Sequence, residues 1–170
     1  MSIRSDNRSK ISSLIHRNPG IHLRELERKL GVSFNSIRYN TEKMVLSGEI
    51  ICEKGPGYSR FYPLGMSERA RLVYSVSRNK TTFKILTELT TQMMLTNKEL
   101  AARTGFAKST VSEHVHFLLG VNLVKLTLSG EGNFKVELQD REFVKSVVDE
   151  LNQVNLRNDV VQNFVDLWDF

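Results

Sequence analysis

The alternation of apolar and polar residues follows the same course in two stretches of the chain that lie 74 positions apart. Each stretch has a short run with helical periodicity, a glycine, a second helical run and an apolar segment typical of a strand. An internal repeat of this kind indicates two modules of the same type. The matching positions are Glu25 and Glu99, Gly31 and Gly105, Ile37 and Val111, and Ile50 and Val124.

The first stretch predicts three helices followed by a β-hairpin. His22 stands where a cap of the second helix belongs, Gly31 suits the left-handed end of that helix, and Ser33 is expected to cap the third. A tip at residues 55–57 separates two strands and corresponds to the wing of a winged helix. The predicted helices are 6–17, 23–30 and 34–47, and the predicted strands are 49–54 and 61–62.

The second stretch predicts the same order of elements. Thr96 and Glu99 have the spacing of a capping box, in which the hydroxyl and the carboxylate satisfy reciprocal backbone amides. Between the stretches, residues 67–74 predict a short linker helix. After Asp140 the pattern predicts an amphipathic helix over Phe143–Leu151 and a second apolar segment over Val160–Trp168. The other predicted helices are 82–89 and 108–119, and the predicted strands are 123–128 and 134–138.

The expected fold is therefore mainly α with small β-wings, built as two tandem winged helix-turn-helix domains plus C-terminal helices. Modules of about 70 residues bury only about 60% of the surface that the unfolded chain exposes, so further packing is expected. The C-terminal segments either cap the second module or form a dimer seam. The expected parts are a first winged helix over 1–66, a linker over 67–80, a second winged helix over 81–139, and C-terminal helices over 140–170.

Charge distinguishes the two modules. The chain has a net charge of +5. Residues 1–66 contain eleven Lys or Arg against six Asp or Glu, whereas residues 67–170 contain thirteen of each. Because phosphate neutralisation supplies most non-specific DNA affinity, the first module is the better candidate for contact with DNA.

The third helix of each module is the predicted reading helix, since this helix enters the major groove in the motif. A helical wheel from Ile37 turns Ile37, Thr41 and Met44 inward and a set rich in hydrogen-bond donors outward. In the second module Glu113 and Phe117 replace Tyr39 and Lys43, which weakens it as a DNA reader and favours a protein contact. The candidate DNA-binding residues are Ser33, Asn35, Ser36, Arg38, Tyr39, Asn40, Lys43, Lys54, Tyr58 and Arg60. A secondary set comprises Lys108, Ser109, Thr110 and Ser112.

A resemblance rests on the segment Asn18–Leu26 (NPGIHLREL), on Gly48-Glu49-Ile50 and on Tyr58-Ser59-Arg60-Phe61-Tyr62-Pro63. These residues resemble archaeal winged-helix transcriptional regulators with two such modules, within the ArsR- and MarR-like superfamily. The likeness is good over residues 8–64 and moderate over 80–138. It implies dimers that bind promoter DNA through Ser33–Lys43 and Lys54–Arg60. One departure is Glu27, where the second helix of such proteins usually has alanine, as Ala101 keeps in the second module.

Other classes of function find no support in the sequence. The single cysteine, Cys52, excludes an internal disulfide and a multi-thiolate metal site. His114 and His116 are two positions apart on a helix, so they point in different directions and cannot share a metal ion. No phosphate loop or catalytic triad occurs, and we expect neither an enzyme nor a cofactor. Without a signal peptide or an apolar run of membrane-spanning length, a cytoplasmic protein is expected.

Two hypotheses of different class remain. The first is a homodimeric, sequence-specific regulator that binds double-stranded DNA. The alternative is a protein–protein scaffold, because tandem winged helices also occur in chromosome-segregation complexes and RNA-polymerase accessory subunits. The neutral second module, with Phe117 and the apolar C-terminal segments as sites for a protein partner, fits the scaffold. The basic first module fits the regulator.

Overall fold

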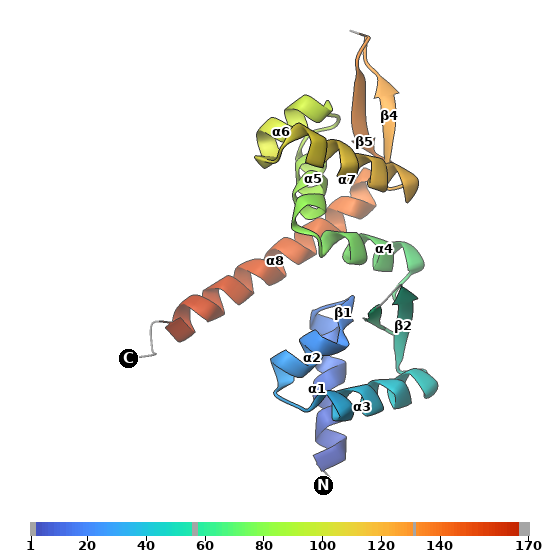
Figure 1. Ribbon diagram of the computed structural model, residues 1–170, viewed down its shortest axis with the longest axis vertical. Helices are drawn as coiled ribbons and strands as arrows, with labels where there is room; N and C mark the ends of the chain where they lie inside the picture. The colour runs from blue at the N-terminus through green and yellow to red at the C-terminus, as the bar shows by residue number, and fades with distance from the viewer. Residues whose placement is uncertain (1–2, 56–57, 131, 167–170) are drawn as a thin grey trace. The chain divides into compact units, whose positions relative to one another are not determined.

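The structure is a computed structural model that describes residues 3–55, 58–130 and 132–166, with side chains described from residue 6 to residue 154 outside those gaps. The chain divides into two compact units, residues 1–75 and 76–170 (Figure 1). Both units are helical with a small antiparallel sheet, which confirms the predicted fold class. No helix in the described part of the chain has the length and apolar character needed to cross a membrane.

The first unit builds a winged helix from three helices and a three-stranded sheet. Its elements are α1 (Ile3–Arg17), β1 (Ile21–His22), α2 (Leu23–Leu30), α3 (Phe34–Leu46), β2 (Ile50–Gly55) and β3 (Tyr58–Pro63). The strands are antiparallel in the order β1-β3-β2, and Phe61 pairs with both Ile21 and Cys52. The buried core draws on every element: Ile11, Ile15, Ile21, Leu26, Ile37, Met44, Ile50 and Phe61.

The turn between α2 and α3 sets the direction of the predicted reading helix. His22 caps α2 as predicted, because its Nδ1 accepts a hydrogen bond from the amide of Glu25 at 3.2 Å. Gly31 ends α2 in the left-handed region, with φ 63°, where side chains with a Cβ are strained. Ser33 does occupy the N-cap of α3, but its hydroxyl makes no capping hydrogen bond. The expectation that Ser33 caps through its side chain is wrong, and the hydroxyl is not committed to the helix.

The end of α3 is tied to α1 by a polar cluster. Arg8 donates from Nε to Oε2 of Glu49 at 2.9 Å and from Nη2 to Oγ of Ser47 at 2.8 Å, and Nη2 also contacts Oε1 of Glu49. This arrangement lowers the pKa of Glu49, chiefly through the hydrogen bond from Arg8. Arg8 therefore stabilises the first unit, and its charge is neutralised within the protein.

A helix, α4 (Glu68–Ser77), follows the first sheet, and the division between the units falls inside it. Its beginning is anchored to the first unit by Arg71. The Nε of Arg71 donates to Oε1 of Glu53 on β2 at 2.5 Å, and Nη1 donates to the carbonyl of Met66 at 2.6 Å.

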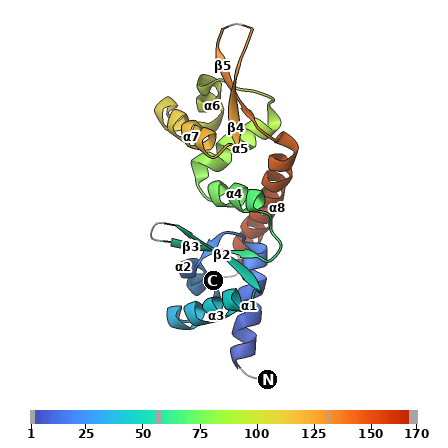
Figure 2. The same cartoon turned by 90° about the vertical axis from the view of Figure 1, so that its right-hand side faces the viewer.

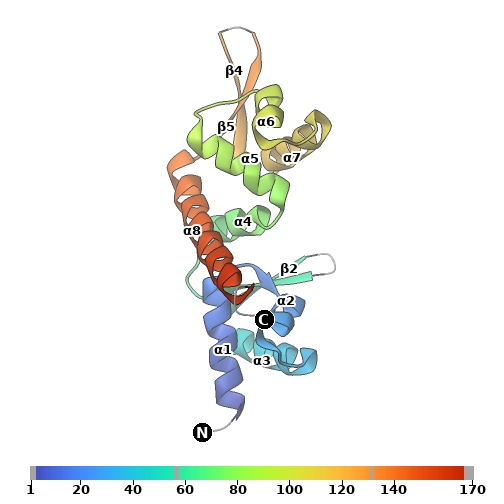
Figure 3. The ribbon, with the colours of Figure 1, turned by 90° about the vertical axis from the view of Figure 1, so that its left-hand side faces the viewer.

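The second unit repeats the winged-helix order. It contains α5 (Lys80–Thr91), α6 (Asn97–Thr104), α7 (Lys108–Gly120), β4 (Val124–Leu128), β5 (Phe134–Leu138) and α8 (Arg141–Asp166). The capping box at Thr96 and Glu99 is present as predicted, and Gly105 ends α6 with φ 75°. Leu95 bridges to Val136 on β5, in the place that β1 has in the first unit. The hairpin of β4 and β5 stands out from α5, α6 and α7 in both side views (Figures 2 and 3).

The C-terminal part differs from the expectation of two helices. A single helix, α8, runs from Arg141 to Asp166, since no proline or glycine interrupts it. Val144, Val147 and Val148 are buried, and α8 packs against α5, so its first part covers the core of the second unit. Arg141 fastens this contact by donating to the carbonyl of Thr90 at 2.9 Å. In the second apolar segment, the side chains of Val160–Val165 and the residues Leu167 and Trp168 lie outside what the structure describes.

Candidate nucleic-acid interface

One face of α3 is buried and the other is exposed. Ile37, Thr41 and Met44 are buried, as the helical wheel predicts. Thr41 satisfies its hydroxyl within the helix by donating to the carbonyl of Ile37 at 3.0 Å. The helix is therefore held rigidly along one side, and its other side is open to a ligand.

The exposed side of α3 carries the donors expected for groove reading. Asn35, Arg38, Tyr39 and Lys43 are exposed, while Ser36 and Asn40 are half-buried. Asn40 donates from Nδ2 to the carbonyl of Ser36 at 2.8 Å, so its amide is partly used within the helix.

Two basic side chains on α3 are arranged differently. The ammonium group of Lys43 lies 5.8 Å from the centroid of the Tyr39 ring, so this aromatic ring orients it on the exposed face. Among the described residues it forms no ion pair. Arg38 instead donates from Nε to Oε1 of Glu42 at 2.9 Å, which raises the pKa of Arg38. Lys43 thus offers a charge that no described carboxylate neutralises.

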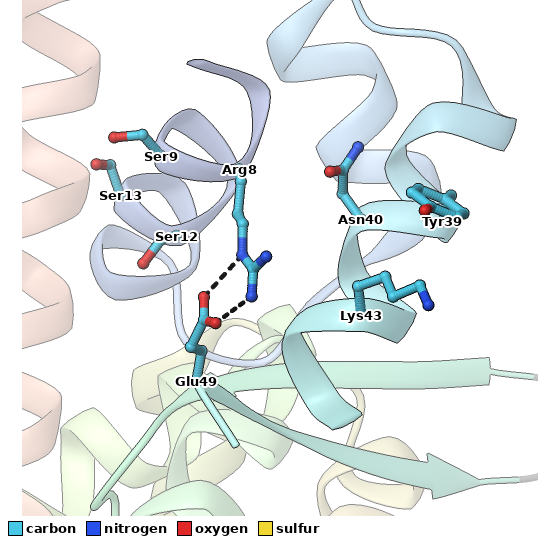
Figure 4. Close-up of a pocket in the computed structure, with 8 residues that line it drawn as sticks. All are labelled: Arg8, Ser9, Ser12, Ser13, Tyr39, Asn40, Lys43 and Glu49. Carbon is cyan, nitrogen blue, oxygen red and sulfur yellow. Dashed lines mark hydrogen bonds and ion pairs between the residues drawn. The ribbon is translucent and has the colours of Figure 1, made fainter. Parts of the chain in front are cut away.

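A groove separates α1 from α3, and Figure 4 shows the residues that line it. Arg8 turns toward Glu49 at its floor, while Lys43 extends from α3. Three serines of α1 also line it, and Figure 4 shows the hydroxyl groups of Ser9 and Ser13 directed away from α3. This groove extends the polar surface of α3 toward α1. The lining residues are Arg8, Ser9, Ser12, Ser13, Tyr39, Asn40, Lys43 and Glu49.

The wing provides a second group of candidate residues. Lys54 and Tyr58 are exposed on β2 and β3. Arg60 differs from the expectation of an exposed phosphate ligand. Its Nη1 donates to the carbonyl of Gly20 at 3.0 Å, its guanidinium lies 5.0 Å from the centroid of the Tyr58 ring, and its Nε is buried without a partner in the described chain. Arg60 holds the wing against the residue before β1, because the cross-strand register places it beside His22.

A depression between α2, α3 and the wing contains residues that sequence reasoning missed. The guanidinium of Arg24 lies 4.2 Å from the centroid of the Phe34 ring and also pairs with Glu27 at 3.0 Å. Glu27, which stands where such proteins usually have alanine, is therefore paired with a basic residue. His22 uses Nδ1 as an acceptor, which leaves Nε2 to carry the proton of the neutral ring as a donor. The sequence did contain a signal for these residues: a predicted helix begins beside the predicted wing. Helix N-termini favour anions. The lining residues are His22, Leu23, Arg24, Phe34, Lys54, Gly55, Tyr58 and Ser59.

The corresponding surface of the second unit is poorer in donors. Lys108, Ser109 and Ser112 are exposed and Thr110 is half-buried at the start of α7. Asn97 reaches Ser112 at 3.5 Å. Ala107 holds the N-cap position that Ser33 has in the first unit, so no hydroxyl is present there. Further along α7, the side chain of Phe117 is 49% exposed.

The described residues of these surfaces form neither a metal site nor a reactive thiol site. The described residues contain no group of three or more His, Cys, Asp or Glu that could hold a metal ion. Burial raises the pKa of the half-buried Cys52 thiol, which therefore stays protonated.

Two family models match the chain, one in each unit. Residues 5–73 match a model described as an N-terminal HTH domain, and residues 78–119 match one described as winged helix-turn-helix DNA-binding. No curated protein matches. The first range covers α2 to β3 and all but the first two residues of α1, and the second covers α5, α6 and all but the last residue of α7.

Several solved structures have some likeness to this chain at low sequence identity. A MarR family transcriptional regulator from Silicibacter pomeroyi is 18% identical, with 82% of this chain and 79% of that chain covered and a TM-score of 0.42. A transcriptional regulator from Thermotoga maritima is 23% identical, with 56% and 72% covered and a TM-score of 0.39. A homodimeric winged helix-turn-helix domain from Mycobacterium bovis, a possible ArsR-family regulator, is 17% identical, with 62% and 96% covered and a TM-score of 0.38.

The fold, the exposed reading helix and the two family matches define the class. Both units have the winged helix-turn-helix fold, and residues 78–119 match a model described as winged helix-turn-helix DNA-binding.

Proposed function

We propose that the protein is a homodimeric transcriptional regulator that binds specific sequences in double-stranded DNA through its first unit. In this proposal α3 enters the major groove and the wing meets the flanking phosphates. The observation that supports it best is the exposed face of α3, where Asn35, Arg38, Tyr39 and Lys43 lie beside a wing with exposed Lys54 and Tyr58. By its resemblance to archaeal regulators, the protein would act on promoter DNA in the cytoplasm.

The side chains divide into readers and phosphate ligands. Arg38 suits a bidentate contact with guanine, and Asn35 or Asn40 suits adenine. The uncommitted hydroxyl of Ser33 and that of Ser36 lie at the N-terminus of α3, where a phosphate is favoured by the helix dipole. Lys43, Lys54 and Tyr58 extend this phosphate surface. In the proposal Arg60 acts by holding the wing in place rather than by direct contact.

The second unit has a lesser part in DNA binding. Its secondary residues, Lys108, Ser109, Thr110 and Ser112, could approach a phosphate, but the unit has no excess of positive charge. This balance and the exposed Phe117 are the observations that favour the alternative function, a protein–protein scaffold.

Selection of bound sequences from a random duplex pool, with the full chain and with Arg38→Ala, tests the proposal. We expect one enriched motif with the wild type and relaxed preference at one position of the motif with the variant. A gel shift at two salt concentrations then separates the two functions. A regulator loses affinity steeply with salt because counterions are released from the duplex, whereas a scaffold shows no such dependence. No enriched motif and no salt-dependent affinity would rule out the regulator.

A further inference from the structure

The wing of the second unit carries an apolar strip beyond the core of its domain. The hairpin pairs Leu126 with Val136 and Leu128 with Phe134, so these four residues share one face. Val136 is buried near the base of the hairpin. Leu126, Leu128 and Phe134 are 48%, 61% and 63% exposed. Figures 2 and 3 show why: the hairpin extends past the helices that cover its base.

The first unit has no such strip. The offset of 74 positions places Lys54 where the second unit has Leu128, and Cys52 where it has Leu126. Lys54 pairs across the hairpin with Ser59, whereas Leu128 pairs with Phe134. A lysine on an edge strand is a common protection against pairing with another chain. At this position the edge strand of the second unit has leucine, and its own lysine, Lys125, lies on the opposite face of the hairpin and is paired with Glu137.

The backbone of β4 is open along the same edge. Gln139 donates to the carbonyl of Leu123 at 3.0 Å, and Ser129 donates to the carbonyl of Asn133 at 2.8 Å. Because hydrogen-bonded and non-hydrogen-bonded positions alternate in an antiparallel ladder, Val124, Leu126 and Leu128 direct their N–H and C=O groups away from β5. In the described part of the chain no backbone group pairs with them. The opposite edge of the hairpin is occupied, since Val136 exchanges hydrogen bonds with Leu95.

We infer that this edge binds a second copy of the chain, with the two β4 strands antiparallel and a two-fold axis at Leu126. In that register Leu126 meets Leu126 of the partner subunit, and Leu128 meets Val124 of the partner subunit. The outward groups at positions 124, 126 and 128 then form about six backbone hydrogen bonds. The apolar tip of each hairpin lies over the apolar base of the other, so the exposed strip is covered by the partner's domain.

The charged residues on the opposite face of the hairpin allow two copies of the chain to pair. Lys125 would meet Thr127 of the partner subunit, and it is already paired with its own Glu137 at 3.2 Å. No like charges face each other in this register. Residues 67–170 contain equal numbers of acidic and basic residues, so two copies of this part of the chain have no net charge to repel each other. A phosphate backbone, in contrast, would find three apolar side chains where the first wing has Lys54.

The expected strength follows from the size of the surface. A standard interface buries about 800 Å² per partner, and a strip of three side chains with about six backbone hydrogen bonds is smaller. We therefore expect a dissociation constant in the micromolar range. The edge of β4 would be the dimer surface of the homodimer that the proposed function includes. It is tested without DNA, so a failure here is distinct from a failure of DNA binding.

Disulfide trapping tests the register in the full chain. In a Cys52→Ser background, Leu126→Cys should give a disulfide-linked dimer on mild oxidation, since facing residues of a hydrogen-bonded pair have Cα atoms about 5.5 Å apart, within disulfide range. Thr127→Cys is the matched control, because the two introduced thiols would be two residues out of register and beyond the roughly 7 Å limit. Equal trapping of both variants, or of neither, overturns the inference.

Sedimentation velocity over 1–200 µM measures the association itself. Leu128→Lys restores the charge that the first wing has, and it should weaken the dimer at least tenfold. Asn133→Lys adds the same charge at the tip, outside the ladder, and should leave the dimer unchanged. Circular dichroism checks that both variants are folded. A wild type that stays monomeric over this range, or a dimer that Leu128→Lys does not weaken, contradicts the inference and points to α8 or another surface.

Discussion

The Nε of Arg38 donates to Oε1 of Glu42 at 2.9 Å, one turn further along the exposed face of α3. Both side chains are largely exposed, at 62% and 59%. The residue best suited to read guanine is therefore held by a carboxylate on the same helix. In the proposed complex, binding to DNA would exchange this ion pair for a base contact and would place Glu42 close to the phosphates. Glu42 would then oppose binding to every sequence, while Arg38 would favour one.

The first prediction concerns this pair. Glu42→Gln removes a charge that phosphates repel and releases Arg38, so affinity for all duplexes should rise roughly two- to fivefold at low salt and less at high salt. Arg38→Ala should weaken binding to the preferred sequence by roughly 5- to 150-fold. The ratio of the affinity for the preferred duplex to the affinity for random DNA should therefore fall. Fluorescence anisotropy with both duplexes measures this. Glu142→Gln, an equal charge change on α8, is the control and should have no effect.

The second prediction concerns the two lysines that the proposal assigns to phosphates. Lys43→Ala and Lys54→Ala should each reduce the slope of log affinity against log salt by about 1, because each removes one phosphate contact. Lys145→Ala removes an equal charge from an exposed position on α8 and should leave the slope unchanged. Equal slopes for all three variants and the wild type would remove both lysines from the interface.

Arg60 gives the third prediction, which separates stability from binding. Arg60→Ala leaves the carbonyl of Gly20 without its partner and exposes one side of the Tyr58 ring. The first unit should lose about 1–2 kcal/mol of stability, measured by urea unfolding. Arg28→Ala, at an exposed position on α2, should cost little. Well below the melting temperature, Arg60→Ala should change the salt slope less than Lys54→Ala does; an equal change would make Arg60 a direct phosphate ligand.

The fourth prediction follows from the capping box of α6. Hydrogen bonds from the amide and the hydroxyl of Thr96 lower the pKa of Glu99 below its usual 4.5. A carboxylate whose pKa is lowered on folding stabilises the protein above that usual value, and the stabilisation is lost as the pH falls through the lowered pKa. Glu99→Gln keeps the cap but cannot ionise, so the wild type should have the higher melting temperature at pH 6, with the difference shrinking between about pH 5 and pH 3.

A matched variant checks the cap itself. Thr96→Ala should destabilise the second unit by about 1 kcal/mol, which corresponds to a fall of about 4–8 °C in the melting temperature of a domain of this size. A constant difference between wild type and Glu99→Gln across the pH range would mean that the charge of Glu99 contributes nothing.

Most of the winged-helix framework could be predicted from interactions between residues that are close in sequence. The glycine at the end of each second helix, the histidine cap and the capping box all act within a few residues, so their signals are visible in the sequence. The inward positions of α3 follow from helical geometry for the same reason. The prediction of two C-terminal helices was wrong because two separate apolar segments do not require a break between them, and residues 152–159 allow a helix to continue.

Long-range contacts account for what was missed. Arg8 counts toward the positive charge of residues 1–66, but its partner Glu49 lies 41 residues away in sequence and beside it in space. Arg60 looked exposed because its partner is a backbone carbonyl, which carries no signature in a sequence. The apolar strip on the second wing was missed because alternation predicts which residues share a face of a hairpin, and does not show how far the domain core extends along it.

The two left-handed glycines, Gly31 and Gly105, lie 74 positions apart and turn the chain in the same way before each third helix. A mutation on the outer face of either helix therefore changes chemistry without changing the backbone that presents it. The two units therefore carry different outer side chains on the same framework. Replacing the outer residues of α7 with those of α3 would change only surface side chains. The same scaffold can thus present a surface for one partner or for another.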